Sequence, residues 1–325
     1  MGKIAFIFKG FLSSYCCHMT GPTKRLTALI LLLLFLLLPQ EALAWGAGVH
    51  LSLGARLLAN PEVLPAALKA LLSAWPLDFL YGCVAADITL GKKFTHYLEH
   101  CHNWRIGLKI LDNADSQRHR ACAWGYLAHL AADTVAHNYF VPYNMTRTFN
   151  TVMLKHTYWE LRAENQVSDE IWELARELGR GDYRSHDRML SSVLSDTILS
   201  FRTNKRLFNS MLLVQRLQQW QKLLNSVSNR SKWEFTLDAQ QEYVDLAYLA
   251  VEGILGDEKS PFWQADPTGD RALTAAKLIR KNLNLLWLDG KLRTDDAEMI
   301  LGDLKRRFRD GITDPDSLLD LLIQA

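Results

Sequence analysis

The pattern of apolar and polar positions is helical over most of the chain. Apolar residues recur three and four positions apart, the spacing of one face of an α-helix, and no segment shows the sustained alternation of a β-strand. Gly and Pro fall mostly between the periodic segments. The pattern therefore predicts an all-α fold with a core of Leu, Ala and Trp. The predicted helices are 52–58, 121–137, 152–165, 169–178, 188–228 with an internal break, 237–255, 271–288, 295–309 and 316–323.

The first 44 residues have the layout of a secretory signal. Lys24 and Arg25 form a positive segment, an almost uninterrupted apolar run follows at 26–38, and the A-x-A triplet that ends at Ala44 matches a signal-peptidase site. The apolar run is shorter than the roughly 20 residues that span a bilayer, so we favour a cleaved signal over an uncleaved membrane anchor. The signal would direct export to the periplasm or the medium, and cleavage after Ala44 would make Trp45 the N-terminus.

Residues 1–18 fit neither the positive segment of a signal nor a domain. Met19 would begin a more ordinary signal peptide and is an alternative start of the protein. We therefore assign no role to Cys16, Cys17 and His18.

The composition gives no sign of a highly charged partner. The full chain has a formal net charge of +2, but the predicted signal holds four basic residues and one acidic residue, so the mature chain has a net charge of −1. A protein this close to neutrality has no overall field to attract nucleic acid. Its remaining cysteines are Cys83, Cys101 and Cys122, which could form one disulfide with a spare thiol or serve as three small core residues.

The most distinctive chemistry lies in the apolar helical segment 121–137. His129, Asp133 and His137 are spaced four residues apart, so they share one face of a helix. Burying two imidazoles and a carboxylate among Leu, Ala and Val is costly unless something pairs them, and a cation would satisfy all three. The alternative is a polar stripe that faces solvent, and the apolar neighbours argue against it.

Further candidate ligands surround this stripe in the sequence. His156 and Glu160 repeat the four-residue spacing, and Asp87 is followed by three closely spaced histidines, of which at least one is expected to be a ligand. His50 lies five residues after Trp45, whose free amino group and carbonyl oxygen could chelate a metal after cleavage. Nitrogen and carboxylate donors without thiolate suit catalytic Zn²⁺, and the number of donors indicates two or three ions. The three histidines after Asp87 are His96, His100 and His102.

In this order and spacing the residues resemble the trinuclear-zinc phosphodiesterases, a superfamily of bacterial zinc-dependent phospholipases C and single-strand-specific zinc nucleases. The matching order is Trp45, His50, Asp87, a histidine, His129-x3-Asp133, His137 and His156-x3-Glu160. The string from Ala128 to Asp133, and the His102-Asn103-Trp104 triplet, are also similar to the phospholipase C/D domain of glycosylphosphatidylinositol phospholipases D. For that reason the resemblance assigns the ligand among the three histidines after Asp87 to His102.

The resemblance implies an all-α, exported enzyme and a ligand set for each ion. Asp87, His102, His129 and Asp133 would surround one zinc, with Asp87 also a candidate general base. Trp45 and His50 would hold a second zinc that Asp133 bridges to the first. His137, His156 and Glu160 would hold the third. The resemblance covers 45–165, which we expect to be the zinc-site helical core, and 166–325 is expected to be a helical remainder packed on the same domain.

Two departures limit what the resemblance implies. The interval from Asp133 to His137 is shorter than in the typical phospholipases C, which affects the expected position of the third zinc. No acidic residue lies between Trp45 and His50, so a preference for choline is not implied.

The function we expect is hydrolysis of a phospholipid or related phosphodiester by a zinc-activated water, because no G-x-S-x-G nucleophile motif is present. One alternative is a nuclease, in which Tyr139, Phe140, Tyr143 and Trp159 would stack on bases instead of filling a core. Another is a zinc-containing envelope protein without turnover. Transient contact with a membrane is expected, and the segment 205–222 is either a packed helix with a basic solvated face or an amphipathic membrane surface. No protein partner is inferred.

Overall fold

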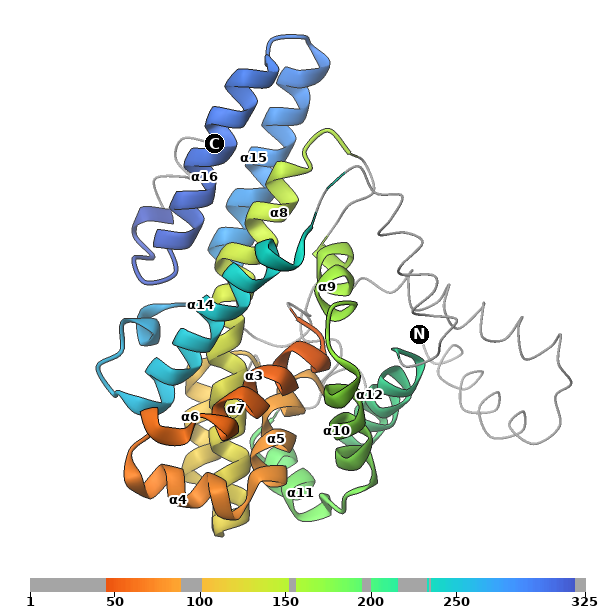
Figure 1. Cartoon of the computed structure of the whole chain (residues 1–325), viewed down its shortest axis with the longest axis vertical. Coiled ribbons are helices and arrows are strands. Elements are labelled where there is room, and N and C mark those ends of the chain that lie inside the picture. Colours follow the sequence, from red (N-terminus) through yellow and green to blue (C-terminus); the bar gives the residue numbers. More distant parts are fainter. Residues whose placement is uncertain are drawn as a thin grey trace, which may run out of the picture. The chain divides into compact units, whose positions relative to one another are not determined.

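The computed structural model describes residues 45–88, 101–151, 156–194, 200–215, 233 and 235–318 (Figure 1). All regular elements in these ranges are helices, which confirms the all-α prediction. The predicted signal with its cleavage site, the alternative start, His96 and His100 lie outside the described residues, as do parts of the predicted helices 152–165, 188–228 and 316–323.

Several helices agree closely with their predicted ranges. The largest shift is in α3, which begins five residues earlier than predicted, and the break predicted inside 188–228 separates α11 from α12. The helices are α3 (Ala47–Ala59), α4 (Ala66–Ala74), α5 (Pro76–Ala85), α6 (Trp104–Asp112), α7 (Gln117–Val135), α8 (Val141–Arg147), α9 (His156–Glu164), α10 (Asp169–Arg180), α11 (Arg184–Val193), α12 (Phe201–Gln215), α14 (Leu237–Gly256), α15 (Asp270–Leu288) and α16 (Thr294–Asp310). Short helical turns are η1 (Pro61–Val63), η2 (Ala86–Ile88) and η6 (Pro261–Gln264), and η5 (Ala136–Phe140) is a π-helix.

Three helices, α4, α5 and α6, were not predicted. Helix α5 is buried over almost its whole circumference, so its sequence is apolar all round and shows no periodicity. Helix α6 is strongly amphipathic and begins at a readable signal, because the side chain of Asn103 accepts a hydrogen bond from the backbone N–H of Arg105. That cap and the apolar pattern after it could have identified α6 from sequence.

The centre of the fold is the contact between α5 and α7, the most extensive between any two described elements. It depends on Gly82 and Gly125: a Cβ atom on Gly82 would meet the carbonyl of Cys122, and one on Gly125 would meet the carbonyl of Phe79, both closer than the 3.0 Å that real Cβ atoms respect. The two backbones therefore touch. This close approach also places the residues that follow α5 against the middle of α7.

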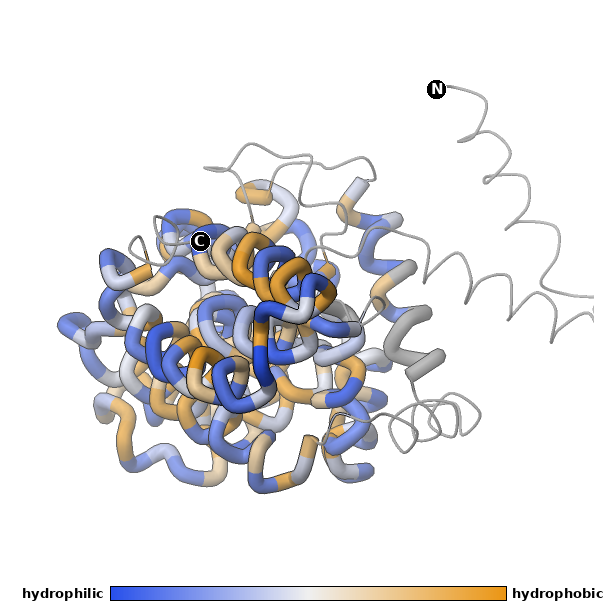
Figure 2. Tube along the Cα trace, turned by 90° about the horizontal axis from the view of Figure 1, so that it is seen from above, coloured by the Kyte–Doolittle hydropathy of each residue, from blue (hydrophilic) through white to orange (hydrophobic). Residues whose placement is uncertain are grey.

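The remaining helices cover this pair. Helix α14 packs on α7 and α3, and α10 packs on α3, while α15 and α16 run antiparallel and both pack against α8 (Figure 1). Most of these helices carry both hydrophobic and hydrophilic positions, as expected of helices with one buried face (Figure 2). Cys83, Cys101 and Cys122 are buried free thiols, so the described cysteines are core residues and form no disulfide.

No single described helix is both long and apolar enough to cross a bilayer. The segments Ala66–Ala74 and Pro76–Ile88 meet that criterion only when taken together, and the chain bends by 94° between them.

Candidate metal centre

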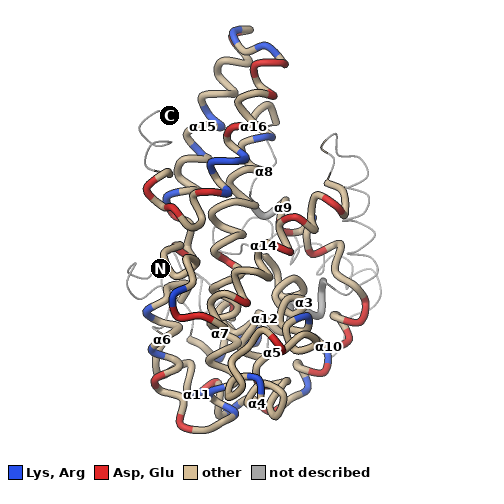
Figure 3. Tube along the Cα trace, turned by 60° about the vertical axis from the view of Figure 1, so that its left-hand side comes forward, with Lys and Arg blue, Asp and Glu red and all other residues tan. Residues whose placement is uncertain are grey.

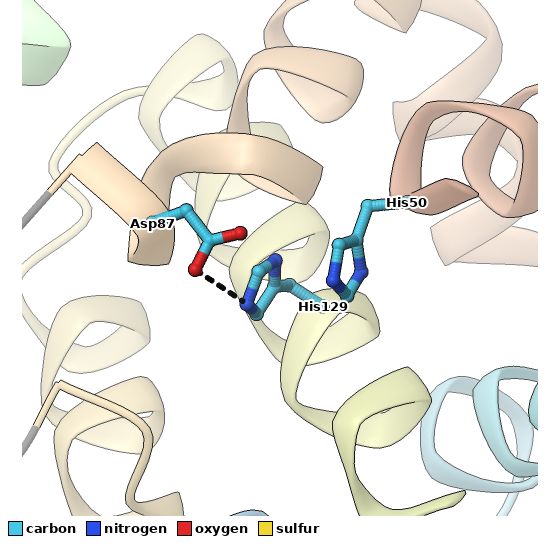
Figure 4. Close-up of side chains that lie close together, drawn as sticks. All are labelled: His50, Asp87 and His129. Atoms are coloured by element: carbon cyan, nitrogen blue, oxygen red, sulfur yellow. Dashed lines mark ion pairs between the residues drawn. The ribbon is translucent and has the colours of Figure 1, made fainter. Parts of the chain in front are cut away.

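Five of the predicted ligands converge from four parts of the chain. His50 lies in the first turn of α3, Asp87 in η2 after α5, and His102 just before α6, while His129 and Asp133 lie on α7. All five are almost completely buried, at 1% or 2% exposure. Figure 4 shows three of them, His50, Asp87 and His129, pointing toward one another from separate helical elements.

Four donor atoms lie close together, and three of them have the spacing of tetrahedral zinc ligands. His102 Nε2 is 3.4 Å from Asp87 Oδ1, 3.0 Å from Asp133 Oδ2 and 3.1 Å from His129 Nε2. His129 Nε2 is 3.2 Å from Asp133 Oδ2 and 3.9 Å from Asp87 Oδ1. A zinc ion with bonds of about 2.0 Å holds tetrahedral ligand atoms roughly 3.3 Å apart. His102, His129 and Asp133 therefore fit one zinc ion, and Asp87 lies beside both histidines as a fourth candidate donor.

The two oxygens of Asp133 face different groups. Oδ2 faces His102 and His129, whereas Oδ1 lies 3.4 Å from Nε2 of His50. Both oxygens of Asp133 and both ring nitrogens of His50 are buried and make no hydrogen bond in the described structure. Buried polar atoms without hydrogen bonds are costly, and a cation between His50 and Asp133 would satisfy Nε2 of His50 and Oδ1 of Asp133. This is the arrangement of a carboxylate that bridges two metal ions.

The histidines are oriented by their second nitrogen. Nδ1 of His129 lies 2.9 Å from the carbonyl oxygen of Cys83, and Nδ1 of His102 lies 3.2 Å from the Cys101 sulfur. The Cys101 carbonyl in turn accepts a hydrogen bond from the Tyr126 hydroxyl. Such partners fix the ring so that Nε2 points at the metal position. The buried cysteines thus hold ligands in place through backbone and thiol contacts.

The protonation states suit metal binding. Burial, helped by the charge of His50, lowers the pKa of His129, so its imidazole is neutral near pH 7. Burial alone would raise the pKa of Asp133, but the charges of His129 and His137 and the close imidazoles of His102 and His129 outweigh it and hold that pKa well below its usual range. A neutral imidazole and an ionised carboxylate are the forms that bind a cation.

His137 departs from the predicted geometry. The sequence pattern assumed one regular helix through residue 137, but α7 ends at Val135 and His137 lies in the π-helix η5, where the spacing of side chains changes. Its Nδ1 lies 2.6 Å from the carbonyl oxygen of Pro267, and its ring centroid is 6.2 Å from that of His102. His137 is therefore buried beside the four-donor group without belonging to it.

The other predicted ligands lie around this group. Trp45 is buried and its ring centroid is 6.4 Å from that of His50. Glu160 is buried on α9, and His156 is the first residue of that helix, with its side chain outside the described structure. The ligand roles of these three residues stay predictions.

One buried residue of this region was missed. Glu164 on α9 accepts hydrogen bonds from the backbone N–H groups of Gly48 (3.2 Å) and Val49 (3.0 Å) in the first turn of α3. A Cβ atom on Gly46 or Gly48 would collide with this carboxylate. Burial raises the pKa of Glu164 to about 7, although the two hydrogen bonds act in the opposite direction. The signal was present in the sequence, because His156, Glu160 and Glu164 repeat the four-residue spacing of the stripe on α7.

The aromatic residues considered for base stacking belong to the core. Tyr139, Phe140 and Trp159 are at most 1% exposed, and Tyr143 is partly buried against the same core. The Tyr139 hydroxyl donates a hydrogen bond to Glu242 on α14, at 2.6 Å. They are therefore placed to pack helices together and offer no open platform for a base.

Comparison with known proteins agrees with the geometry. A search of curated proteins and a search of solved structures each gave no match. The family model described as zinc dependent phospholipase C matches residues 49–205, a range that contains His50, Asp87, the α7 stripe and α9. Through residues 49–205, this chain belongs to the zinc-dependent phospholipase C family.

Proposed function

We propose that this protein is a phospholipase C-like hydrolase that cleaves a phospholipid on the diacylglycerol side of its phosphate. The observation that carries the proposal is the buried four-donor group of Asp87, His102, His129 and Asp133, in which the two histidines and Asp133 have the spacing of zinc ligands. Membership of the zinc-dependent phospholipase C family supports the same chemistry.

The proposed ligand sets follow from the placement of the residues. The four-donor group would hold one zinc. His50, with the amino nitrogen and carbonyl oxygen of Trp45, would hold a second, and the Oδ1 atom of Asp133 faces that position. A third would be held by His137, His156 and Glu160. When bound, zinc ions bring water to a pKa near 7 and neutralise charge on phosphoryl oxygens.

Groups of the protein itself orient the metal ligands and transfer the proton. The Cys83 carbonyl and the Cys101 thiol keep the imidazoles of His129 and His102 turned toward the centre. Asp87, held beside both histidines, is the candidate base that takes a proton from the attacking water. The water oxygen bonds to phosphorus, the phosphorus–glycerol oxygen bond breaks, and the glycerol oxygen leaves with a proton as diacylglycerol.

The proposal includes export and processing. Cleavage after Ala44 would free the amino group of Trp45, so the second zinc site would be complete only after the signal is removed. The near-neutral charge of the mature chain and the core position of the aromatic residues favour a lipid over a nucleic acid.

The test compares phosphatidylcholine with single-stranded DNA as substrates of the purified zinc-loaded protein. We expect release of the phosphorylated head group from the lipid, its loss in Asp133→Asn, and its retention in Asp182→Asn, which changes an exposed carboxylate. Cleavage of DNA without cleavage of lipid would identify a nuclease instead. A fully zinc-loaded protein that cleaves neither substrate would be a non-catalytic zinc protein.

A further inference from the structure

The tip of the α15–α16 hairpin, residues 285–292, exposes a run of apolar side chains. Leu285 is 51% exposed, Leu286 41%, Trp287 37% and Leu288 72%. Consecutive residues of a helix point about 100° apart, so four in a row cover most of its circumference. Apolar residues exposed one at a time need no explanation, but a contiguous exposed run marks an interaction site.

The tip is built to hold these side chains in place. The carbonyl of Leu286 accepts hydrogen bonds from the backbone N–H groups of Lys291 (2.9 Å) and Leu292 (3.2 Å). Gly290 has a φ of +68°, in the left-handed region where glycine is favoured, and its outward side is open. The tight turn therefore ends α15 abruptly and leaves its last turn projecting.

The base of the tip is anchored to the end of α8. The ring of Trp287 lies edge-on to that of Phe149, with centroids 5.8 Å apart, and the Asn284 side chain donates a hydrogen bond to the carbonyl of Phe149 at 2.9 Å. Leu283, two residues before the tip, and Leu292, its last residue, are buried. The apolar run is thus presented by an ordered part of the protein.

The arrangement fits a lipid bilayer better than a protein groove. A groove covers one side of a helix, whereas exposed apolar side chains spread over several sides of a helix end are buried together only in a medium that surrounds it. Trp and Leu are residues that enter the apolar boundary of a membrane, with Trp favoured at its interface. No described helix spans a bilayer by itself, so contact through a tip of this kind would be peripheral.

The charges around the tip indicate which surface it fits. Basic and acidic positions both occur around the tip (Figure 3). Exposed side chains of the two kinds are equal in number over 281–296, and Lys291 pairs with Asp289 at 3.1 Å. A tip with equal positive and negative charge has no net attraction for anionic lipids. Membrane binding would therefore depend on the burial of apolar side chains, and its affinity would change little with salt concentration. The residues are Lys281, Lys291 and Arg293 against Asp289, Asp295 and Asp296.

We propose that the tip of the α15–α16 hairpin inserts into a phosphatidylcholine bilayer and holds the enzyme at its substrate. This inference rests on the proposed function and extends it with a lipid-binding element outside residues 49–205. It also differs from the membrane surface considered at 205–222, because Lys205 forms an ion pair with Asp187 and Phe208 is buried.

The test measures co-sedimentation of the zinc-loaded protein with vesicles of dioleoylphosphatidylcholine on ice, and head-group release is followed in the same samples so that binding is read on uncleaved lipid. The full chain is expressed, its N-terminus is established by mass spectrometry, and all variants share that background. Leu285→Ser with Leu288→Ser should weaken vesicle binding at least tenfold, with little change at high salt. The matched control is Leu237→Ser with Leu249→Ser, because these leucines on α14 are 70% and 54% exposed.

The outcomes separate this inference from the proposed function. Equal vesicle binding by the tip variant and the wild type, or no binding by either, would overturn the role of the tip. So would a concentration-dependent dimer that the tip variant loses while vesicle binding is absent. Hydrolysis of a monomeric short-chain phosphodiester, measured with zinc, should be unchanged in the tip variant. If the wild type lacks this hydrolysis but binds vesicles through the tip, the proposed function fails and the membrane contact stands.

Discussion

The carboxylate of Glu164 on α9 accepts a hydrogen bond from the backbone N–H of Val49 on α3, with Oε1 and N 3.0 Å apart. The first N–H groups of a helix have no partner within it, and Gly46 at the N-cap of α3 offers no side chain. Glu164 supplies the missing acceptor from another helix. It therefore ties α9, which carries Glu160, to the turn that carries Trp45 and His50.

Glu164→Ala should remove this connection. Buried N–H groups left without an acceptor cost about 2 to 3 kcal/mol in stability, and we expect the zinc proposed at Trp45 and His50 to bind more weakly. Glu164→Gln keeps an acceptor oxygen and should restore part of both losses. Denaturant unfolding and zinc titration measure the two effects, with exposed Glu298→Gln as the control. Unchanged unfolding and zinc affinity in Glu164→Ala would show that the connection has no role.

Gly125→Ala should separate α5 from α7. The added Cβ would collide with the carbonyl of Phe79, so the helices must move apart, at a cost of about 3 kcal/mol. The same movement should displace Asp87 from His129 and reduce the zinc content. Gly302→Ala on α16 is the control, because nothing lies within 4 Å of its added Cβ, and it should stabilise the protein by about 0.5 to 1 kcal/mol. Thermal unfolding and metal analysis give the comparison.

Removal of metal should destabilise the protein. A ligand present at a thousand times its dissociation constant stabilises the folded state by about 4 kcal/mol, so a chelator should lower the unfolding temperature markedly, and zinc should restore it. Asp133→Asn should lower the zinc content by more than one ion, because its two oxygens face two groups. An unfolding temperature that does not respond to chelator in the wild type would contradict a structural contribution from zinc.

Asp78 should make stability depend on pH far from the metal centre. This buried carboxylate lies 2.8 Å from His186 Nε2 and 3.0 Å from Arg118 Nε. Burial raises its pKa, but hydrogen bonds from His186 and Arg118 and their charges lower it below the ordinary 3.8. A depressed pKa stabilises the fold above the unfolded value, and this stabilisation is lost as the pH falls through the folded value.

Asp78→Asn should therefore cost about 2 kcal/mol near neutral pH, and the difference from the wild type should shrink below pH 3.8. Urea unfolding of the metal-free proteins at several pH values measures it. A penalty that is constant over the whole pH range would indicate that the hydrogen bonds, and not the charge, account for the stabilisation.

A residue added before Trp45 should block the second zinc. The α-amino group would then be an amide, which does not bind zinc at neutral pH in this way, so we expect one zinc fewer and a large loss of activity. The same residue added after Ala325 is the control. Equal zinc content and equal phosphodiester cleavage with and without the added residue at Trp45 would refute the role of the N-terminus.

The helical pattern and the ligand stripe were predictable because both depend on short intervals along the chain. The spacing of His129 and Asp133 places them on one face of any helix, and the apolar neighbours imply that the face is buried. Helix α5 was not predictable in the same way, because a helix buried on all sides has no polar face to reveal its period.

The relations between distant residues were decided by the tertiary structure. The family resemblance selected His102 among three histidines, but only the packing of α5 and α6 on α7 brings it within 3.4 Å of Asp87 and 3.1 Å of His129. The π-helix at His137 and the contact of Glu164 with Val49 were likewise invisible, because each depends on elements that meet from far along the chain. Local spacing determines which donors can share a helix face, whereas the distances between donors on different helices depend on how closely their backbones pack, here through Gly82 and Gly125.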